Sequence, residues 1–332
     1  MVEEMSASEQ VLTRRKIVLG TRGSDLALAQ ARMAECALRK RWELEVQIEI
    51  IRTSGDESIL RGAEGSQGRT LKGFATGSLE VARDVRARGR KGIFTAELER
   101  ALMEKRINVA VHSAKDLPSE MDQALIIAAT LPRAMAEDLL LRKDSTSKPI
   151  RTIATGSVRR QRQARAMNPQ AQIFPLRGNV PTRLRKFIDS NWDAIILARA
   201  GLERLGFSPP DFEFEGHRIC AEILSSEEFL PAGGQGIIAL QTLEADFPVR
   251  EIVSAIDDRK THLCLQAERE LLRLLHGDCD LPVGVHARFV NREMELRAQV
   301  FGDGLIPQTA VARGSDPEKV AAEVFQNLQA EV

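Results

Sequence analysis

Short apolar segments with strand character alternate with longer segments of helical spacing over most of this 332-residue chain. The alternation is most regular between residues 152 and 198. There we expect strands at 152–155, 172–176 and 194–198, separated by helices at 157–167 and 182–190. Such alternation is typical of sheets covered by helices on both faces, so it predicts doubly wound α/β domains.

The first part of the chain shows the same alternation of expected strands and helices, and the last part does not. Strands are expected at 16–19, 46–51, 108–112, 125–130, 138–142 and 237–241, and helices at 26–42, 94–106 and 249–257. After a helix at 262–275 the pattern changes to strands at 283–290, 294–301 and 309–313 and a closing helix at 317–329. We therefore predict two doubly wound α/β domains plus a small C-terminal α+β domain.

A glycine-rich connector, LPAGGQG at 230–236, helps to set the expected domain boundaries. We predict a first domain at 1–136 and 237–258, a second at 137–230 with a hinge at 231–236, and a third at 259–332. Residues 57–90 hold six glycines and several arginines without sustained periodicity. That segment is either an atypical lid over a site or a surface loop without function.

Composition excludes several classes of protein. The formal net charge is zero and aromatic residues make up 4%, which argues against a nucleic-acid partner. No apolar stretch reaches membrane-spanning length, and the first fifteen residues are polar, so we expect neither a membrane partner nor a secretory signal. A cytoplasmic location is then the default. The four cysteines are expected to be reduced thiols, and because none has metal-site spacing no metal is predicted.

Residues 151–186 hold nine basic residues and no Asp or Glu. Eight of the nine are arginines, whose planar guanidinium suits carboxylates or phosphates. A solvated helix face is the alternative. Within the stretch, Thr155, Ser157, Arg159 and Arg160 surround a predicted helix start, where backbone N–H groups favour anions, so we predict an anion site.

Two further places can carry chemistry. The strand at 108–112 ends in SAKDLP, which puts Lys115 and Asp116 at a strand terminus; an exposed ion pair in a turn is the alternative. Asp116 is suited to stabilising a cation or moving a proton. His112 is expected to be a satisfied core histidine. Cys279 is a loop thiol, and lone cysteines are usually inert.

Ten segments occur together in a fixed order: GTRGSDLALAQA, TSGD, KGIFTAELERAL, VAVHSAKDLP, TGSVRRQ, LRGNVPTRL, DAIILARAGLERLG, LPAGGQG, AERELL and GDCDLPVG. In these segments the chain resembles the porphobilinogen deaminase (hydroxymethylbilane synthase) family from residue 16 to the end. The resemblance implies three domains, the first two like periplasmic binding proteins. It also implies a monomeric transferase that joins four porphobilinogen molecules head to tail into hydroxymethylbilane and releases ammonia.

The same resemblance implies a cofactor and a set of site residues. A dipyrromethane would be bound covalently through Cys279, with Asp116 as the catalytic carboxylate. Cofactor carboxylates would be held by Ser113, Lys115, Thr155, Ser157, Arg159, Arg160 and Arg183. Substrate or the growing chain would be held by Arg22, Ser24, Gln30, Lys91, Phe94, Arg177 and Arg204.

The chain departs from the family pattern in several places. Residues 57–90 form a longer segment than usual, and Ala87 stands where a lysine is common; Arg86, Arg88 or Arg90 is a candidate replacement. Gln241 replaces a usual glutamate, and Asp278 replaces a glycine beside Cys279. The alternative function is a non-catalytic binding protein for a carboxylate-rich metabolite. A phosphate-handling enzyme is a weaker alternative, because no phosphate loop is found.

Overall fold

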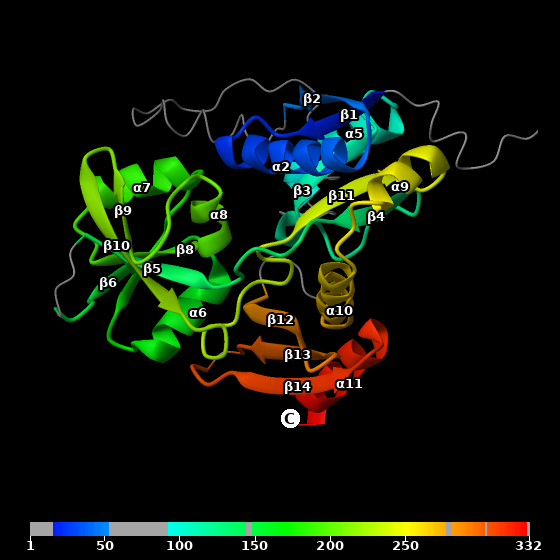
Figure 1. The fold of residues 1–332 in the computed structure, drawn as a ribbon. Coiled ribbons are helices and arrows are strands. Elements are labelled where there is room, and N and C mark those ends of the chain that lie inside the picture. The colour runs from blue at the N-terminus through cyan, green and yellow to red at the C-terminus, as the bar shows by residue number, and fades with distance from the viewer. Residues whose placement is uncertain (1–15, 53–91, 144–147, 277–280, 303, 331–332) are drawn as a thin grey trace, which may run out of the picture. The chain divides into compact units, whose positions relative to one another are not determined.

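The structure, a computed structural model, describes residues 16–52, 92–143, 148–276, 281–302 and 304–330. These residues form three sheets with helices packed against them (Figure 1). The α/β fold class predicted from the sequence is confirmed. None of the described helices is both long and apolar enough to cross a membrane.

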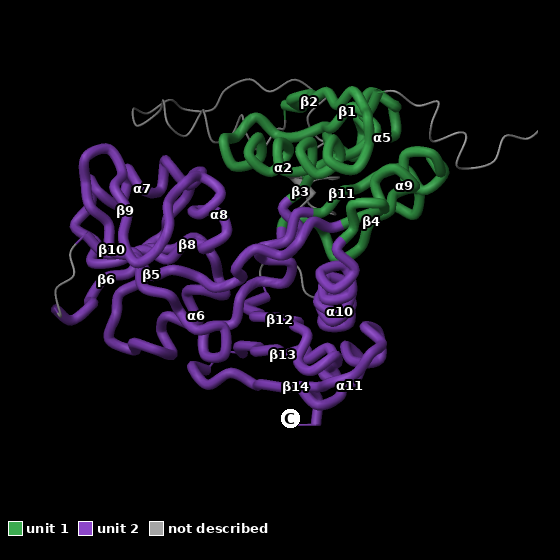
Figure 2. The backbone as a smooth tube through the Cα atoms, viewed as in Figure 1, with its two compact units in different colours: residues 1–112, 116–129, 239–257 green, residues 113–115, 130–238, 258–332 purple. Residues whose placement is uncertain are grey.

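The chain divides into two compact units, coloured in Figure 2. Unit 1 comprises residues 1–112, 116–129 and 239–257, and unit 2 comprises residues 113–115, 130–238 and 258–332. Unit 2 contains both the second and the third predicted domains. The finer boundaries inside it stay a prediction.

Unit 1 is built around a five-stranded sheet in the order β2-β1-β3-β11-β4. The strands are β1 Lys16–Thr21, β2 Glu45–Ile50, β3 Val109–Ser113, β4 Leu125–Thr130 and β11 Ile238–Leu243, and the helices are α2 Asp25–Arg41, α5 Gly92–Met103 and α9 Phe247–Ser254. β1 runs parallel to β2 and to β3. Parallel neighbours place their carboxyl ends at the same sheet edge, where α/β proteins bind ligands.

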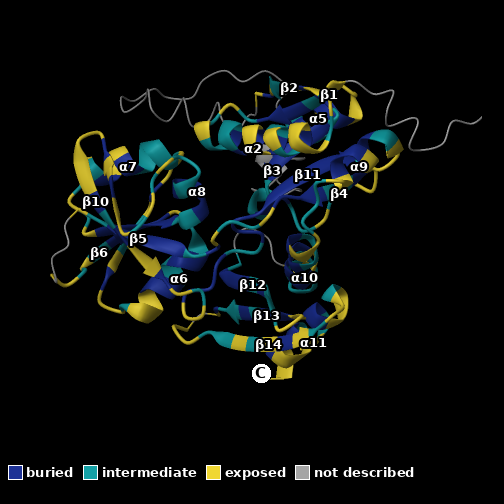
Figure 3. Ribbon diagram, in the orientation of Figure 1, coloured by how far each residue is buried: buried dark blue, intermediate teal, exposed yellow. Residues whose placement is uncertain are grey.

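The first part of unit 2 holds a six-stranded sheet in the order β7-β6-β8-β5-β10-β9. Its strands are β5 Asp138–Arg142, β6 Thr152–Ala154, β7 Gln172–Phe174, β8 Ala194–Ala198, β9 Asp211–Phe214 and β10 His217–Leu224, with helices α6 Val158–Met167, α7 Val180–Asp189 and α8 Arg199–Glu203. The central strands β5 and β8 are almost wholly buried (Figure 3).

This sheet is mixed, which the alternating sequence pattern did not predict. β6 is parallel to β7 and β8, but β5 is antiparallel to both β8 and β10. The β9–β10 hairpin, which turns at Glu215 and Gly216 with positive φ, was not expected either. The antiparallel β5 brings its amino end, Asp138, beside the carboxyl end of β8.

The second part of unit 2 is a three-stranded antiparallel sheet packed against two helices. The elements are α10 Arg259–Leu274, β12 Val283–Val290, β13 Glu293–Val300, β14 Gln308–Gly314 and α11 Pro317–Ala330. Alternate strand residues such as Val285, Leu296 and Ala312 face the helices and form a core of their own. This agrees with the small α+β domain expected for the last seventy residues or so.

The glycine-rich connector is held by close backbone packing inside unit 2. Gly234 has a φ of +74°, and a Cβ at this position would lie 2.8 Å from the backbone N of Lys115. The fully buried carboxylate of Glu268 on α10 accepts from the N–H of Gly234 at 2.6 Å and from Arg133 Nη1 at 2.6 Å. The connector is therefore tied to α10 through Gly234 and packs closely against the backbone of Ala114 and Lys115, just before Asp116.

Candidate active site

In unit 1, several of the predicted site residues follow the carboxyl ends of β1 and β3. Arg22 and Ser24 follow β1, and Ser24 caps α2 by accepting from the N–H of Ala27 at 3.3 Å. Gln30 is buried one turn and a half into the same helix. Because β1 and β3 are parallel neighbours, Arg22 and Asp116 follow strands that end at the same sheet edge.

Asp116 ends the short 3₁₀ turn Ala114–Asp116 that follows β3, and its side chain is half-buried. Within the described residues, no hydrogen bond or ion pair ties its carboxylate to another side chain. A carboxylate in that state can meet a positive charge on a bound molecule.

His112, on the strand that leads to Asp116, is a core histidine as predicted. Its Nε2 lies 2.9 Å from Oε1 of Gln241. The amide N of Gln241 donates to the carboxylate of Glu99 at 3.3 Å, which leaves the amide oxygen facing the imidazole. His112 therefore donates through Nε2.

In unit 2, the carboxyl end of β6 leads directly into α6. Ser157 is the N-cap and accepts from the N–H of Arg160 at 3.4 Å, and the buried Thr155 hydroxyl accepts from the N–H of Ser157 at 3.3 Å. The local sequence TGSVRR thus forms a capped helix start, the anion-favouring geometry that was predicted.

Arg159 and Arg160, in the first turn of α6, are both buried and share one counterion. Arg159 Nη2 donates to Asp138 Oδ2 at 2.8 Å, and Arg160 Nη2 donates to Asp138 Oδ1 at 2.8 Å. Although burial opposes it, the two guanidinium groups hold the pKa of the Asp138 carboxyl well below its usual range. The carboxylate is therefore ionised, and the cluster has two positive charges and one negative charge.

Arg204 follows the last residue of α8 and contacts the glycine-rich connector 230–236. Its Nη2 donates to the carbonyl O of Gly236 at 2.7 Å, and burial lowers the pKa of its guanidinium to about 10. The next residue back, Gln235, donates to Asp138 Oδ1 at 2.8 Å. Gln235 and Gly236 thus connect Arg204 with the Asp138 cluster.

The remaining basic residues of the stretch 151–186 differ in their surroundings. Arg183, on α7, is half-buried and its Nε donates to the carbonyl O of Gly178 at 2.7 Å, whereas Arg177 is exposed. Arg185 points outward and pairs with Glu215. Part of the stretch is therefore buried around Asp138, and part is the solvated face that was the alternative.

Several predicted positions lie outside the described residues. These are Cys279, Asp278, Lys91 and the segment 57–90; the backbone of Phe94 is described, as part of α5. Among the described cysteines, Cys36, Cys220 and Cys264 are free thiols. Burial raises the pKa of the Cys264 thiol to about 12, so it is a poor nucleophile.

Comparison with known proteins identifies the family. The family model for porphobilinogen deaminase, dipyromethane cofactor binding domain, matches residues 17–251, and the model for the porphobilinogen deaminase C-terminal domain matches residues 262–330. The chain belongs to the porphobilinogen deaminase family. A porphobilinogen deaminase from Chlorobium phaeobacteroides (strain BS1) is 36% identical over 292 residues, which cover 86% of this chain and 83% of that protein.

A second relative covers almost the whole chain. The porphobilinogen deaminase from Syntrophobacter fumaroxidans (strain DSM 10017 / MPOB) is 34% identical over 327 residues, 96% of this chain and 95% of the relative. Among solved structures, the Bordetella pertussis BvgS periplasmic VFT2 domain aligns with a TM-score of 0.41 at 13% identity, over 75% of this chain and 90% of that one. The family models and the two relatives confirm the predicted family and its cofactor, dipyrromethane, and they do not favour a non-catalytic binding protein.

The described residues fit a cofactor whose pyrrole rings carry carboxylates. The Nε atoms of Arg159, Arg160 and Arg204 are buried and have no hydrogen-bond partner among the described residues. A buried N–H group of a guanidinium that lacks an acceptor is costly, and an added carboxylate supplies both an acceptor and negative charge.

Asp138 was not among the predicted site residues. It begins an apolar strand, and ligand sites in parallel sheets lie at the other end of strands. One signal was available: nine basic residues without a single acid between 151 and 186 need a counterion from elsewhere in the chain. Only the antiparallel direction of β5 shows that Asp138 supplies it.

Proposed function

We propose that this chain is a hydroxymethylbilane synthase, a transferase that joins four porphobilinogen molecules head to tail and releases one ammonia for each. The observation that carries the proposal is the pair of buried arginines, Arg159 and Arg160, that share the single buried carboxylate of Asp138. Arg204 is connected to this cluster through Gly236 and Gln235. This arrangement suits a ligand that is rich in carboxylates. Family membership supports the same reaction.

Each guanidinium has a defined task in this proposal. Every porphobilinogen brings an acetate and a propionate, and a charge-assisted hydrogen bond from arginine to such a carboxylate contributes about 1.5–3 kcal/mol. We assign cofactor carboxylates to Ser113, Lys115, Thr155, Ser157, Arg159, Arg160 and Arg183. Arg22, Ser24, Gln30, Lys91, Phe94, Arg177 and Arg204 are assigned to the substrate and the growing chain.

Asp116 is assigned the catalytic role. Loss of ammonia from porphobilinogen leaves positive charge on the substrate, and an ionised carboxylate beside it stabilises that charge and can accept the proton released when the new bond forms. Dipyrromethane bound through Cys279 would supply the pyrrole carbon to which the first substrate is joined. The covalent attachment keeps the reacting ends together, and effective concentrations on the order of 10⁵ M are reached for well-oriented groups.

The proposal is tested by intact-mass measurement together with assays of ammonia and hydroxymethylbilane. The wild-type chain, expressed in a host that makes porphobilinogen, is expected to carry a dipyrromethane adduct that Cys279→Ser lacks. Asp116→Asn is expected to keep the fold and lose at least a thousandfold in turnover. Glu120→Gln, an exposed carboxylate four residues further on, is the matched control and should retain activity.

Two outcomes would contradict the assignment. Near-wild-type turnover by Asp116→Asn would remove its catalytic role. Tight binding of porphobilinogen without ammonia release, and without an adduct, would favour the carrier function instead. We further propose that the enzyme acts as a monomer in the cytoplasm, which sedimentation and cell fractionation test.

A further inference from the structure

The counterion of Arg159 and Arg160 is a fully buried side chain at the centre of the six-stranded sheet. Asp138 is 0% exposed and has Ala198 of β8 on one side and Leu224 of β10 on the other. Its Oδ2 accepts from Arg159, and its Oδ1 accepts from both Arg160 and Gln235. Both carboxylate oxygens are therefore engaged by donors whose positions are set by other elements.

The two guanidinium groups are also held by hydrogen bonds from their Nη1 atoms. Arg159 Nη1 donates to Gln163 Oε1 at 2.8 Å and to the carbonyl O of Leu230 at 2.6 Å. Arg160 Nη1 donates to the carbonyl O of Ile196 at 3.2 Å. Each arginine is thus held at both Nη atoms, while its buried Nε has no partner among the described residues.

The charges of this cluster do not cancel. Two buried guanidinium groups meet one buried carboxylate, and the other partners are the neutral amides Gln163 and Gln235 and backbone carbonyls. A group of buried charges with one net positive charge is unfavourable unless an anion is added. The Asp138 carboxylate neutralises one of the two positive charges, and the other positive charge is available to an anionic ligand.

We infer that Asp138 is a positioning residue, which orients Arg159 and Arg160 for one cofactor carboxylate while keeping the three-residue cluster at a net charge of +1. The inference rests on the proposed function, because it assigns that carboxylate to dipyrromethane. Asp138 does not touch the cofactor itself. It acts through the two arginines, and Gln235 of the connector holds its Oδ1 from the other side.

The conservative variant Asp138→Asn tests this. An amide has the same shape, but its NH₂ group faces a guanidinium, so one arginine loses its acceptor. Purified apoprotein would be incubated with porphobilinogen, and the rate of adduct formation measured by intact mass for each mole of folded protein. Asp138→Asn is expected to form the adduct at least tenfold more slowly, while its loaded fraction keeps a near-normal KM for porphobilinogen.

Two comparisons separate positioning from a general loss of stability. Ile219→Ala removes a fully buried core side chain of the same sheet. Asp138 pairs with Leu224 at the far end of β10, so the Ile219 variant should lower stability without slowing adduct formation. If Asp138 acts through Arg159, the losses in Asp138→Asn and Arg159→Gln are expected to be less than additive in the double variant.

The outcomes distinguish the inference from the proposed function. No adduct in the wild-type chain means that the proposed function has failed. Wild-type loading with unchanged loading in folded Asp138→Asn, or additive losses in the double variant, would overturn the positioning role alone. Should Asp138→Asn fail to fold, the same measurement is made on Gln235→Leu, which keeps both charges of the ion pairs. It removes the neutral donor to Oδ1 together with the Gln235 hydrogen bonds to the carbonyl O of Ala136 and from Arg160 Nη2. Unchanged loading overturns the inference, and slowed loading in the folded variant supports it.

Discussion

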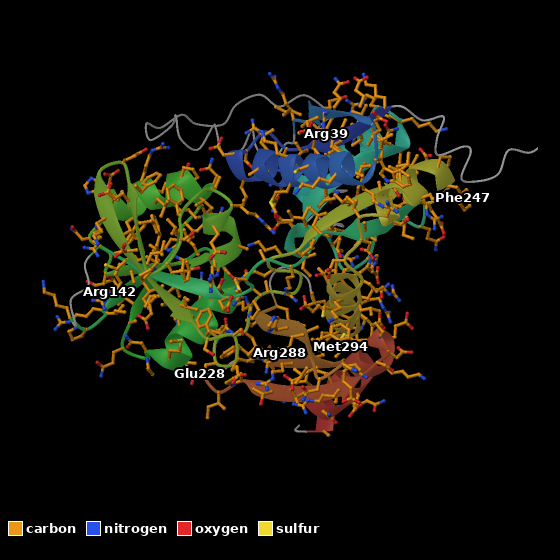
Figure 4. The ribbon with its side chains drawn as sticks, in the orientation of Figure 1. Arg39, Arg142, Glu228, Phe247, Arg288 and Met294 are labelled. Carbon is orange, nitrogen blue, oxygen red and sulfur yellow. The ribbon has the colours of Figure 1, made fainter. Side chains whose placement is uncertain are left out.

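Two clusters in unit 2 pair one carboxylate with several arginines, and they differ in their access to water. Around Asp138 the two arginine side chains are only 5% and 6% exposed. Around Glu295, on the sheet of the C-terminal part, Arg288, Arg297 and Arg313 are 37%, 30% and 57% exposed (Figure 4 labels Arg288). The residue types are the same, but only the second set can satisfy its remaining N–H groups with water.

The comparison teaches what burial does to an arginine. In the Asp138 cluster every N–H needs a protein or ligand acceptor, so the guanidinium groups are fixed and an uncompensated charge is costly. In the Glu295 cluster, water screens the charges and fills missing hydrogen bonds. Glu295 accepts hydrogen bonds from arginines on three adjacent strands, β12, β13 and β14. Its carboxylate therefore links the three strands of this sheet.

The largest effect is expected from Asp138→Ala. Removing the carboxylate leaves two buried guanidinium groups without their counterion, which should lower the free energy of unfolding by about 3–5 kcal/mol. Urea unfolding followed by circular dichroism measures this. A loss below about 1 kcal/mol would show that water reaches the cluster, and the contrast between the two clusters would disappear.

An intermediate effect is expected from Glu295→Gln. With its arginines partly exposed, the cost should be about 1 kcal/mol near neutral pH. Arg313 and Arg297 lower the pKa of the Glu295 carboxyl from 4.5 to about 2, against the opposing effect of burial. Its ionised form therefore stabilises the folded state above pH 4.5, and this contribution is lost as the pH falls from about 4.5 to about 2.

The pH dependence distinguishes this variant from the wild type. Thermal melting between pH 6 and pH 2 should show a shallower loss of stability for Glu295→Gln than for the wild-type chain. Equal slopes would mean that the three arginines do not favour the ionised carboxylate.

The smallest effect is expected from Arg185→Gln. Arg185 belongs to the same basic stretch as Arg159, but it is 55% exposed and pairs with Glu215, itself 47% exposed. Its removal should change the free energy of unfolding by no more than about 0.5 kcal/mol. Adduct formation should be unchanged as well, and a tenfold loss there would place Arg185 among the ligand-binding residues.

Local patterns predicted most of the elements well. The strands β4, β5, β8 and β12 have the expected bounds. A short apolar run between polar turns fixes the first and last residues of a strand closely. The β9–β10 hairpin was missed: its polar residues face solvent and its turn uses Glu215 at positive φ, which no local rule favours. The roles of Asp116, Cys279 and the other site residues remain predictions from resemblance.

The sequence by itself determined the family, the α/β class, the cofactor and the presence of an anion-binding arginine stretch, because these depend on ordered motifs and on charge that is local in the chain. Only the tertiary structure decided which arginines are buried and which carboxylate balances them. That choice depends on the direction of β5 in its sheet, which long-range strand pairing sets. Asp138 and Arg160 lie 22 positions apart in the chain, and the fold alone brings them to 2.8 Å.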